Sequence, residues 1–110
     1  MSTIAVRPVL PQDEIFLYDL YFAVRGPELD AVIGITPAQK EHLLRIQWQG
    51  QLYSYTQRYP NSCYHIVLLD SKPVGRLWVA PLDRELHLVD IAVHPSVQRK
   101  GIGSVLIQRL

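Results

Sequence analysis

The segment that indicates the fold most clearly is residues 93–103, Val93-His94-Pro95-Ser96-Val97-Gln98-Arg99-Lys100-Gly101-Ile102-Gly103. An apolar, β-branched segment precedes this one and an amphipathic pattern follows it, so it joins a strand to a helix. Gly101 and Gly103 have no Cβ, which lets the backbone turn and approach a ligand closely. The following helix presents unpaired N–H groups and the positive end of its dipole at the same point. The pattern predicts an anion site that suits a phosphate group.

The charges and the glycine spacing of this segment indicate which kinds of phosphate-binding loop it can be. Arg99 and Lys100 precede the glycines, and no acidic residue lies between Pro95 and Leu110. A dinucleotide-binding fingerprint would need a third glycine where Leu106 stands, and the P-loop consensus of nucleotide triphosphatases is absent. From the two glycines alone, a glycine-rich turn without a ligand remains an open alternative.

The rest of the chain predicts a strand, two helices, three strands and a last helix. Thr36, Pro37 and Gln39 form the signature of a helix start, in which threonine caps, proline takes the first position and glutamine completes a capping box. Gly26-Pro27 is expected to end the helix before it. The predicted strands cover residues 4–7, 64–69, 74–80 and 85–93, and the predicted helices cover residues 11–25, 37–59 and 101–110.

Gln98-x-x-Gly101-x-Gly103, after a strand ending Ile91-Ala92-Val93-His94-Pro95, resembles the acetyl-coenzyme A-binding motif of the GNAT superfamily of N-acetyltransferases. The order of predicted elements is similar to that of the superfamily over essentially all of residues 1–110, as a single domain. The resemblance implies an α/β (α+β) fold, with a mainly antiparallel mixed sheet flanked by helices. Members of the superfamily continue with further strands and a helix, so we expect a domain that is incomplete at its C-terminus.

The resemblance also implies a cofactor and a reaction. Acetyl-coenzyme A would donate its acetyl group to a small-molecule or peptide amine, which attacks the thioester directly. The strand before the loop would pair with the pantetheine arm through Ile91, Ala92 and Val93. Backbone N–H groups of the loop would bind the pyrophosphate at Gln98, Arg99, Lys100, Gly101, Ile102, Gly103 and Ser104. The fifth strand and the fourth helix, which often carries a tyrosine acid, would lie beyond Leu110. A non-catalytic binding module, a partner-dependent module and an inactive fragment therefore stay open as alternatives.

Two residues of the last predicted strand are candidates for the catalytic base. Asp90 is the only carboxylate inside an apolar segment, where it is placed to take a proton from an ammonium group or to be paired by Arg76. His87 titrates near neutrality, and the resemblance places it where histone-type members keep a catalytic glutamate. Because three positions separate them, the two side chains face opposite sides of a regular strand unless a bulge intervenes.

The remaining candidate residues give weaker indications. The resemblance places the connection between the first two helices beside the acceptor site, and Glu28 and Asp30 there favour a cationic amine. The single cysteine, Cys63, has no base beside it in sequence, and the four histidines show no metal-ligand spacing, so no metal is predicted. The candidate substrate contacts are Arg25, Glu28, Asp30 and Trp48.

Composition excludes several classes of protein. The 110 residues carry 11 basic and 10 acidic side chains, a net charge of +1, which argues against a dedicated nucleic-acid binder. We find no apolar stretch long enough for a membrane span and no secretion signal, so the prediction is a cytoplasmic protein. The last predicted strand would leave an exposed apolar edge, which predicts a homodimer through that edge.

Overall fold

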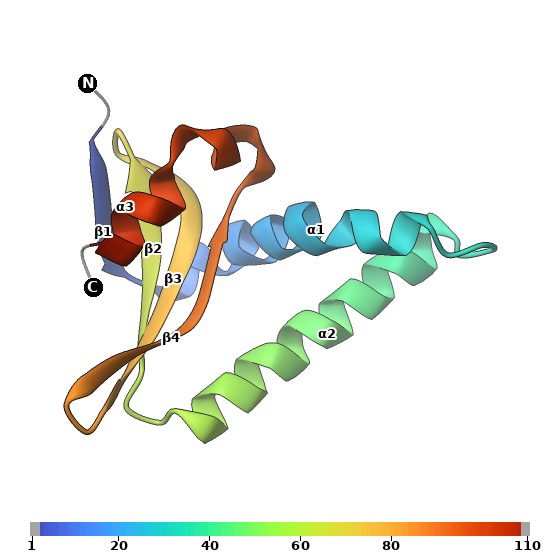
Figure 1. The fold of residues 1–110 in the computed structure, drawn as a ribbon. Coiled ribbons are helices and arrows are strands. Elements are labelled where there is room, and N and C mark those ends of the chain that lie inside the picture. The colour runs from blue at the N-terminus through green and yellow to red at the C-terminus, as the bar shows by residue number, and fades with distance from the viewer. Residues whose placement is uncertain (1–2, 109–110) are drawn as a thin grey trace.

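Strands and helices follow each other with short connections in the computed structural model, which describes residues 3–108 except the side chains of Arg99 and Lys100. Figure 1 shows their arrangement. In chain order, the elements are β1 (Ile4–Pro8), the 3₁₀ turn η1 (Pro11–Asp13), α1 (Glu14–Asp30), α2 (Pro37–Arg58), β2 (Cys63–Leu69), β3 (Lys72–Leu82), β4 (Glu85–Val93), the 3₁₀ segment η2 (Pro95–Lys100) and α3 (Ile102–Gln108). The mixed α and β class predicted from the sequence is confirmed.

The four described strands form one antiparallel sheet in the order β1-β2-β3-β4. β3 extends beyond the predicted residues 74–80, because a tight hairpin turn at Asp70 and Ser71 lets pairing begin at once. Both turn residues have positive φ, 50° and 70°, as the favoured two-residue hairpins require. β4 lies at the edge of the described sheet, so its outer N–H and C=O groups have no strand beside them.

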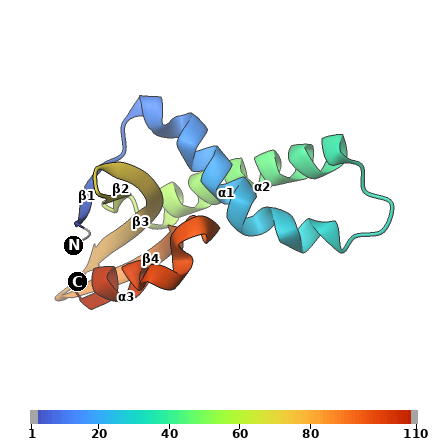
Figure 2. The ribbon, with the colours of Figure 1, turned by 90° about the horizontal axis from the view of Figure 1, so that it is seen from above.

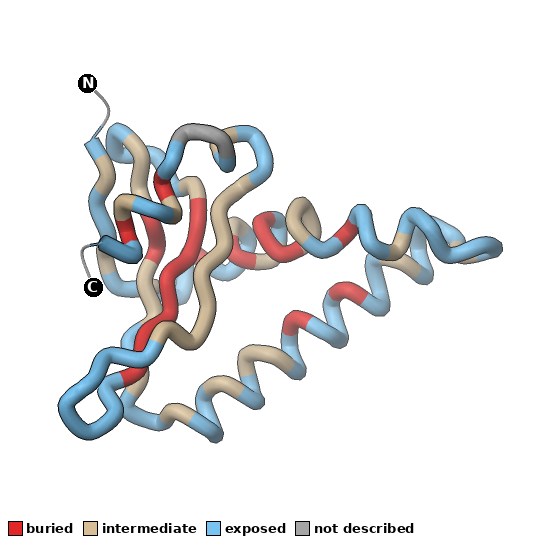
Figure 3. The backbone as a smooth tube through the Cα atoms, in the orientation of Figure 1, coloured by how far each residue is buried: buried red, intermediate tan, exposed pale blue. Residues whose placement is uncertain are grey.

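Helices cover both faces of the sheet. α1 and α2 lie on one face and α3 on the other, as Figures 1 and 2 show. The first face packs Leu17, Trp48 and Ile66 into one core, and the second packs Val67, Leu77 and Ile102 into another. Burial is concentrated along β3 (Figure 3), which is sandwiched between the two cores. Within residues 3–108, no helix is both long enough and apolar enough to span a membrane.

The predicted end of the first helix at Gly26-Pro27 is wrong. α1 continues through Pro27 to Asp30, although proline removes one backbone donor and crowds the preceding turn. Tertiary contacts offset that cost, because Lys40 of α2 pairs with Asp30 and lies over the ring of Phe22. The connection to α2 is therefore shorter than residues 26–35.

The start of α2 is confirmed. The Thr36 hydroxyl accepts a hydrogen bond from the Gln39 N–H at 3.1 Å, and the Gln39 side chain accepts one from the Thr36 N–H at 2.9 Å. The last helix is also present as Ile102–Gln108, while the predicted positions 109 and 110 lie outside the described residues.

A β-bulge interrupts β4. Trp78 of β3 pairs with Asp90, but the next residue, Val79, pairs with Leu88, so Val89 is the extra residue. A bulge shifts the alternation of side chains by one position. His87 and Asp90 consequently lie on the same face of the sheet, the one covered by α1 and α2, and not on opposite faces as a regular strand would place them.

Candidate active site

A cavity of about 150 Å³ lies between α1 and the C-terminal end of β4. β4 contributes Asp90 and the three residues expected to pair with pantetheine, and the loop contributes Gln98. Its lining residues are Leu20, Tyr21, Val24, Arg25, Arg76, Asp90, Ile91, Ala92, Val93 and Gln98. Two larger open grooves of about 460 and 450 Å³ contain none of the predicted catalytic or cofactor residues. The structure thus brings the predicted base and the predicted pantetheine strand to one cavity.

Close contact with β3 holds the end of β4 in place. Gly75 pairs with Val93, and a Cβ at position 75 would lie 2.4 Å from the carbonyl oxygen of Ala92. Any other residue at position 75 would push the backbone of residues 92 and 93 outward. The His94 N–H also donates to the Val74 carbonyl at 2.7 Å, which continues the pairing one step past β4.

Side chains fix the loop that follows β4. The His94 Nδ1 accepts a hydrogen bond from the Ser96 N–H at 3.1 Å and so caps η2. Gln98 donates from Nε2 to the Val93 carbonyl at 3.1 Å, which ties the loop to the strand. Gly101 has φ 72°, a left-handed conformation that favours glycine. A Cβ built at Gly101, or at Gly103 in the first turn of α3, meets no atom within 4 Å apart from its immediate neighbours in the chain, so both glycines have open space beside them.

Asp90 takes part in a buried polar network. Its Oδ2 accepts a hydrogen bond from Nη2 of Arg76, a residue only 3% exposed. The same Arg76 nitrogen donates to Gln51 of α2, and Nη1 lies 3.5 Å from the Tyr64 hydroxyl. Burial acts to lower the pKa of Arg76, but Tyr64 and Asp90 outweigh it and the pKa is raised. Arg76 therefore stays charged, and the alternative in which it pairs with Asp90 is confirmed.

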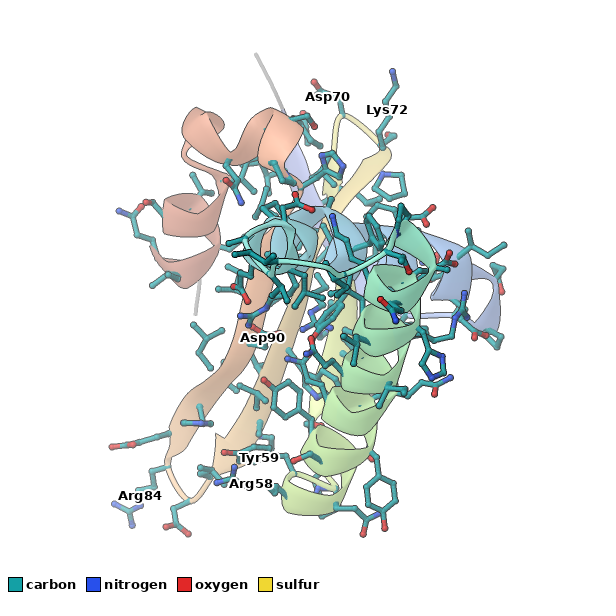
Figure 4. The ribbon with its side chains drawn as sticks, turned by 90° about the vertical axis from the view of Figure 1, so that its right-hand side faces the viewer. Arg58, Tyr59, Asp70, Lys72, Arg84 and Asp90 are labelled. Atoms are coloured by element: carbon teal, nitrogen blue, oxygen red, sulfur yellow. The ribbon has the colours of Figure 1, made fainter. Side chains whose placement is uncertain are left out.

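His87 lies away from the cavity, near the start of β4. Its ring stacks on that of Tyr59 at 5.4 Å between centroids, and Nε2 lies 3.4 Å from the Tyr59 hydroxyl. Figure 4 shows Asp90 near the middle of the sheet and Tyr59 at the far end of α2. The bulge puts both base candidates on one face, and only Asp90 lines the cavity.

The other candidates separate into different environments. Arg25 lines the cavity and pairs weakly with Glu28 at 3.5 Å. Asp30 is paired with Lys40, and Trp48 is buried in the core between α1, α2 and the sheet. Across residues 3–108, no group of three or more histidine, cysteine, aspartate or glutamate side chains is arranged to hold a metal ion.

Comparison with known proteins identifies the family. A family model described as "Acetyltransferase (GNAT) family" matches residues 28–110.

The chain belongs to the GNAT acetyltransferase family.

Solved structures agree with this assignment at the level of the fold. The PaiA N-acetyltransferase of Thermoplasma acidophilum, in complex with coenzyme A, superposes with a TM-score of 0.65 at 13% identity, over 97% of this chain and 69% of that one. A GCN5-related N-acetyltransferase of Rhodopseudomonas palustris gives 0.63 at 24% identity, over 99% and 64%. A GNAT acetyltransferase of Brucella melitensis, in complex with acetyl-CoA, gives 0.57 at 16% identity, over 97% and 65%. No curated protein matches the chain.

Two conclusions follow for this GNAT chain. It spans about two thirds of the length of the solved structures that it resembles. The family uses acetyl-CoA, and the residues present fit that group: β4 has an unpaired edge for an extended amide chain, and the glycines leave room for phosphates.

Of the four residues that α1 contributes to the cavity, the sequence suggested only Arg25, and Leu20, Tyr21 and Val24 were missed. Leu20, Tyr21 and Val24 form an apolar stripe at helical spacing, which predicts core positions, and two of them are indeed buried. The same stripe reaches the cavity opposite β4. The only signal in the sequence is a tyrosine among aliphatic residues, because its ring suits a core while its hydroxyl needs a polar surrounding.

Proposed function

We propose that this GNAT chain binds acetyl-CoA and transfers the acetyl group to a primary amine by direct attack on the thioester. The observation that carries the proposal is the cavity in which Asp90 lies beside Ile91, Ala92, Val93 and Gln98. A base and a strand edge for pantetheine are what such a transfer needs at one point.

The cofactor would be held by backbone groups. The segment Ile91–Val93 on the outer edge of β4 would pair with the pantetheine amides through its outward backbone groups. The Ala92 carbonyl faces Gly75 of β3, and the Val93 carbonyl already accepts from Gln98. The N–H groups of residues 98–104 would surround the pyrophosphate, with Gly101 turning the chain toward it. Bound there, acetyl-CoA supplies an acetyl group activated as a thioester.

Asp90 is the proposed base. Arg76 engages Oδ2 and so fixes the carboxylate, while Oδ1 has no partner among the described residues. A carboxylate held by one oxygen can take the ammonium proton on the other without leaving its place. His87 is the alternative base, but its contact with Tyr59 places it outside the cavity.

A binding experiment with one loop variant and one control tests the cofactor site. Gly101→Glu puts a carboxylate where the pyrophosphate would lie. Gly34→Glu is the matched control, because Gly34 also has positive φ, 85°, and open space, but lies in the α1–α2 connection. Titration calorimetry with acetyl-CoA and with coenzyme A should show saturable binding to wild type and to Gly34→Glu, and a loss of at least about tenfold in Gly101→Glu.

The proposal fails if the folded wild type shows no binding at millimolar ligand, or if both glutamate variants bind equally well. Binding without release of free thiol across a panel of primary amines would favour the alternative of a non-catalytic module.

A further inference from the structure

Tyr21 of α1 is one of the residues that line the cavity. The residue is only 8% exposed, and the described cavities include it in this one alone. Its hydroxyl has no hydrogen-bond partner among the described residues. The unpartnered polar side-chain atoms that are fully buried among the described residues are Trp48 Nε1, His65 Nδ1 and Arg76 Nε. The Tyr21 hydroxyl is not one of them, so it keeps some contact with solvent. The Tyr21 ring is buried, but its hydroxyl is unpaired and still accessible to solvent. Since Tyr21 lines this cavity, we take the cavity to be where the hydroxyl meets solvent.

The surroundings of Tyr21 keep this hydroxyl a donor beside positive charge. Burial raises its pKa above the ordinary value of 10, against the opposing effect of Arg25 and Arg76. The phenol is therefore neutral and protonated at every working pH. Arg25 and Arg76 lie within electrostatic reach of the hydroxyl, and each is paired with a carboxylate, Glu28 and Asp90 respectively.

We propose that the Tyr21 hydroxyl donates a hydrogen bond to the carbonyl oxygen of the acetyl thioester. The inference rests on the proposed function, which brings the thioester to the end of β4 that faces Tyr21 across the cavity. A donor fixed by a buried ring acts most strongly when the oxygen gains charge, since it needs no reorganisation during the reaction. Tyr21 is then a catalytic residue supplied by α1.

The step balances without a further reactant. The amine nitrogen forms a bond to the carbonyl carbon, and electron density moves onto the carbonyl oxygen, where the Tyr21 hydrogen bond stabilises it. The carbon–sulfur bond then breaks and its electron pair leaves on sulfur as the coenzyme A thiolate. Asp90 has already taken the ammonium proton before the attack, so the surplus proton of the nitrogen goes to this thiolate, which leaves as the coenzyme A thiol. Tyr21 keeps its own proton throughout.

Infrared spectroscopy of bound acetyl-CoA tests this without knowledge of the acceptor. The probe is acetyl-CoA labelled with ¹³C at the thioester carbonyl, saturating wild type and two variants. Tyr21→Phe keeps the buried ring and removes the hydroxyl. Tyr55→Phe is the matched control, because Tyr55 packs edge-on against Trp78 and does not line the cavity.

We expect the carbonyl band to move to higher wavenumber in Tyr21→Phe and to keep the wild-type position in Tyr55→Phe. Once an acceptor is known, Tyr21→Phe should also lower kcat by about 10²–10³, as the loss of an oxyanion donor does. An unchanged band in a Tyr21→Phe protein that binds acetyl-CoA overturns the role of Tyr21 alone. Absence of saturable binding to wild type overturns the proposed function and this inference with it.

Discussion

At the level of single residues, the chemistry of the site depends on the hydrogen bonds that the Arg76 guanidinium makes. It reaches Asp90, Gln51 and Tyr64 from one buried position, so it links β4, α2 and β2. The ion pair occupies Oδ2 of Asp90, and Asp90 lines the cavity. Removing Arg76 would leave a carboxylate that is only 17% exposed without its countercharge, which is costly.

The choice between the two base candidates can be measured directly. Asp90→Asn keeps an acceptor for Arg76 but cannot take a proton, so the rate of thiol release with an amine acceptor should fall by about 10²–10⁴. His87→Ala removes a ring outside the cavity and should leave that rate close to wild type. Acetyl-CoA affinity, which should be unchanged in both, is the control. A larger loss in His87→Ala than in Asp90→Asn would make His87 the base.

At the level of elements, the connection between β1 and α1 depends on one ion pair. Asp13 is buried at the end of η1 and accepts hydrogen bonds at 2.8 Å from both terminal nitrogens of Arg7 on β1. The Leu10 N–H donates to the same carboxylate at 2.8 Å. The Arg7 hydrogen bonds, and then that of Leu10, lower the pKa of Asp13 from 3.8 to about 2. These contacts set where α1 starts, and hence where Tyr21 and Arg25 meet the cavity.

This ion pair predicts a specific dependence of stability on pH. A carboxyl group whose pKa is lower in the folded state stabilises the fold above its unfolded pKa, and that contribution disappears as the pH falls from 3.8 through about 2. Asp13→Asn should lower the free energy of unfolding by about 2 kcal/mol at neutral pH. The difference from wild type should shrink as the pH approaches 2. Urea unfolding across this range checks it, and a difference that does not vary with pH would contradict the assignment.

At the level of the whole molecule, the sheet ends at the edge strand β4, which is available both to the cofactor and to a second copy of the chain. Within residues 3–108, no strand pairs with the outer side of β4, and apolar residues of this strand such as Leu86 are exposed. Such an edge pairs with another chain unless something covers it. The pantetheine arm is proposed to occupy the same edge at Ile91, Ala92 and Val93, so a second copy and the cofactor would compete.

We therefore expect concentration-dependent self-association that coenzyme A reverses. Sedimentation velocity at rising protein concentration should show a dimer, and saturating coenzyme A should return it to monomer. The Gly101→Glu variant should form the dimer but resist this reversal. A monomer at all concentrations would exclude pairing through β4, and a dimer unaffected by coenzyme A would place the interface elsewhere.

Local signals predicted much of this arrangement. The capping box at Thr36, the order of strands and helices along the chain and the strand–loop–helix segment from Val93 to Gly103 depend on neighbours in sequence, and the structure has each of them where predicted. The end of α1 could not be predicted, because Lys40, ten residues away, supports the turn that Pro27 weakens. The bulge at Val89 could not be predicted either, since it arises from pairing with β3.

In the site, too, local sequence patterns predicted some residues, while others depend on tertiary packing. The motif spacing predicts Gln98 and the single carboxylate in an apolar strand predicts Asp90, and the cavity brings the two residues together. Tyr21 reaches that cavity only because α1 crosses the end of β4, which no local pattern encodes, and Arg25 was expected near the site only from the family resemblance.

The measurement to make first is a titration of ¹⁵N-labelled protein with acetyl-CoA, followed by the backbone amide resonances. The largest shifts should map to residues 91–93 and 98–104, with smaller ones at Leu20, Tyr21 and Arg25 across the cavity. The connection around Gly34 should stay unchanged. Shifts confined to another surface, or none at millimolar acetyl-CoA, would contradict the placement of the acetyl-CoA site at the end of β4.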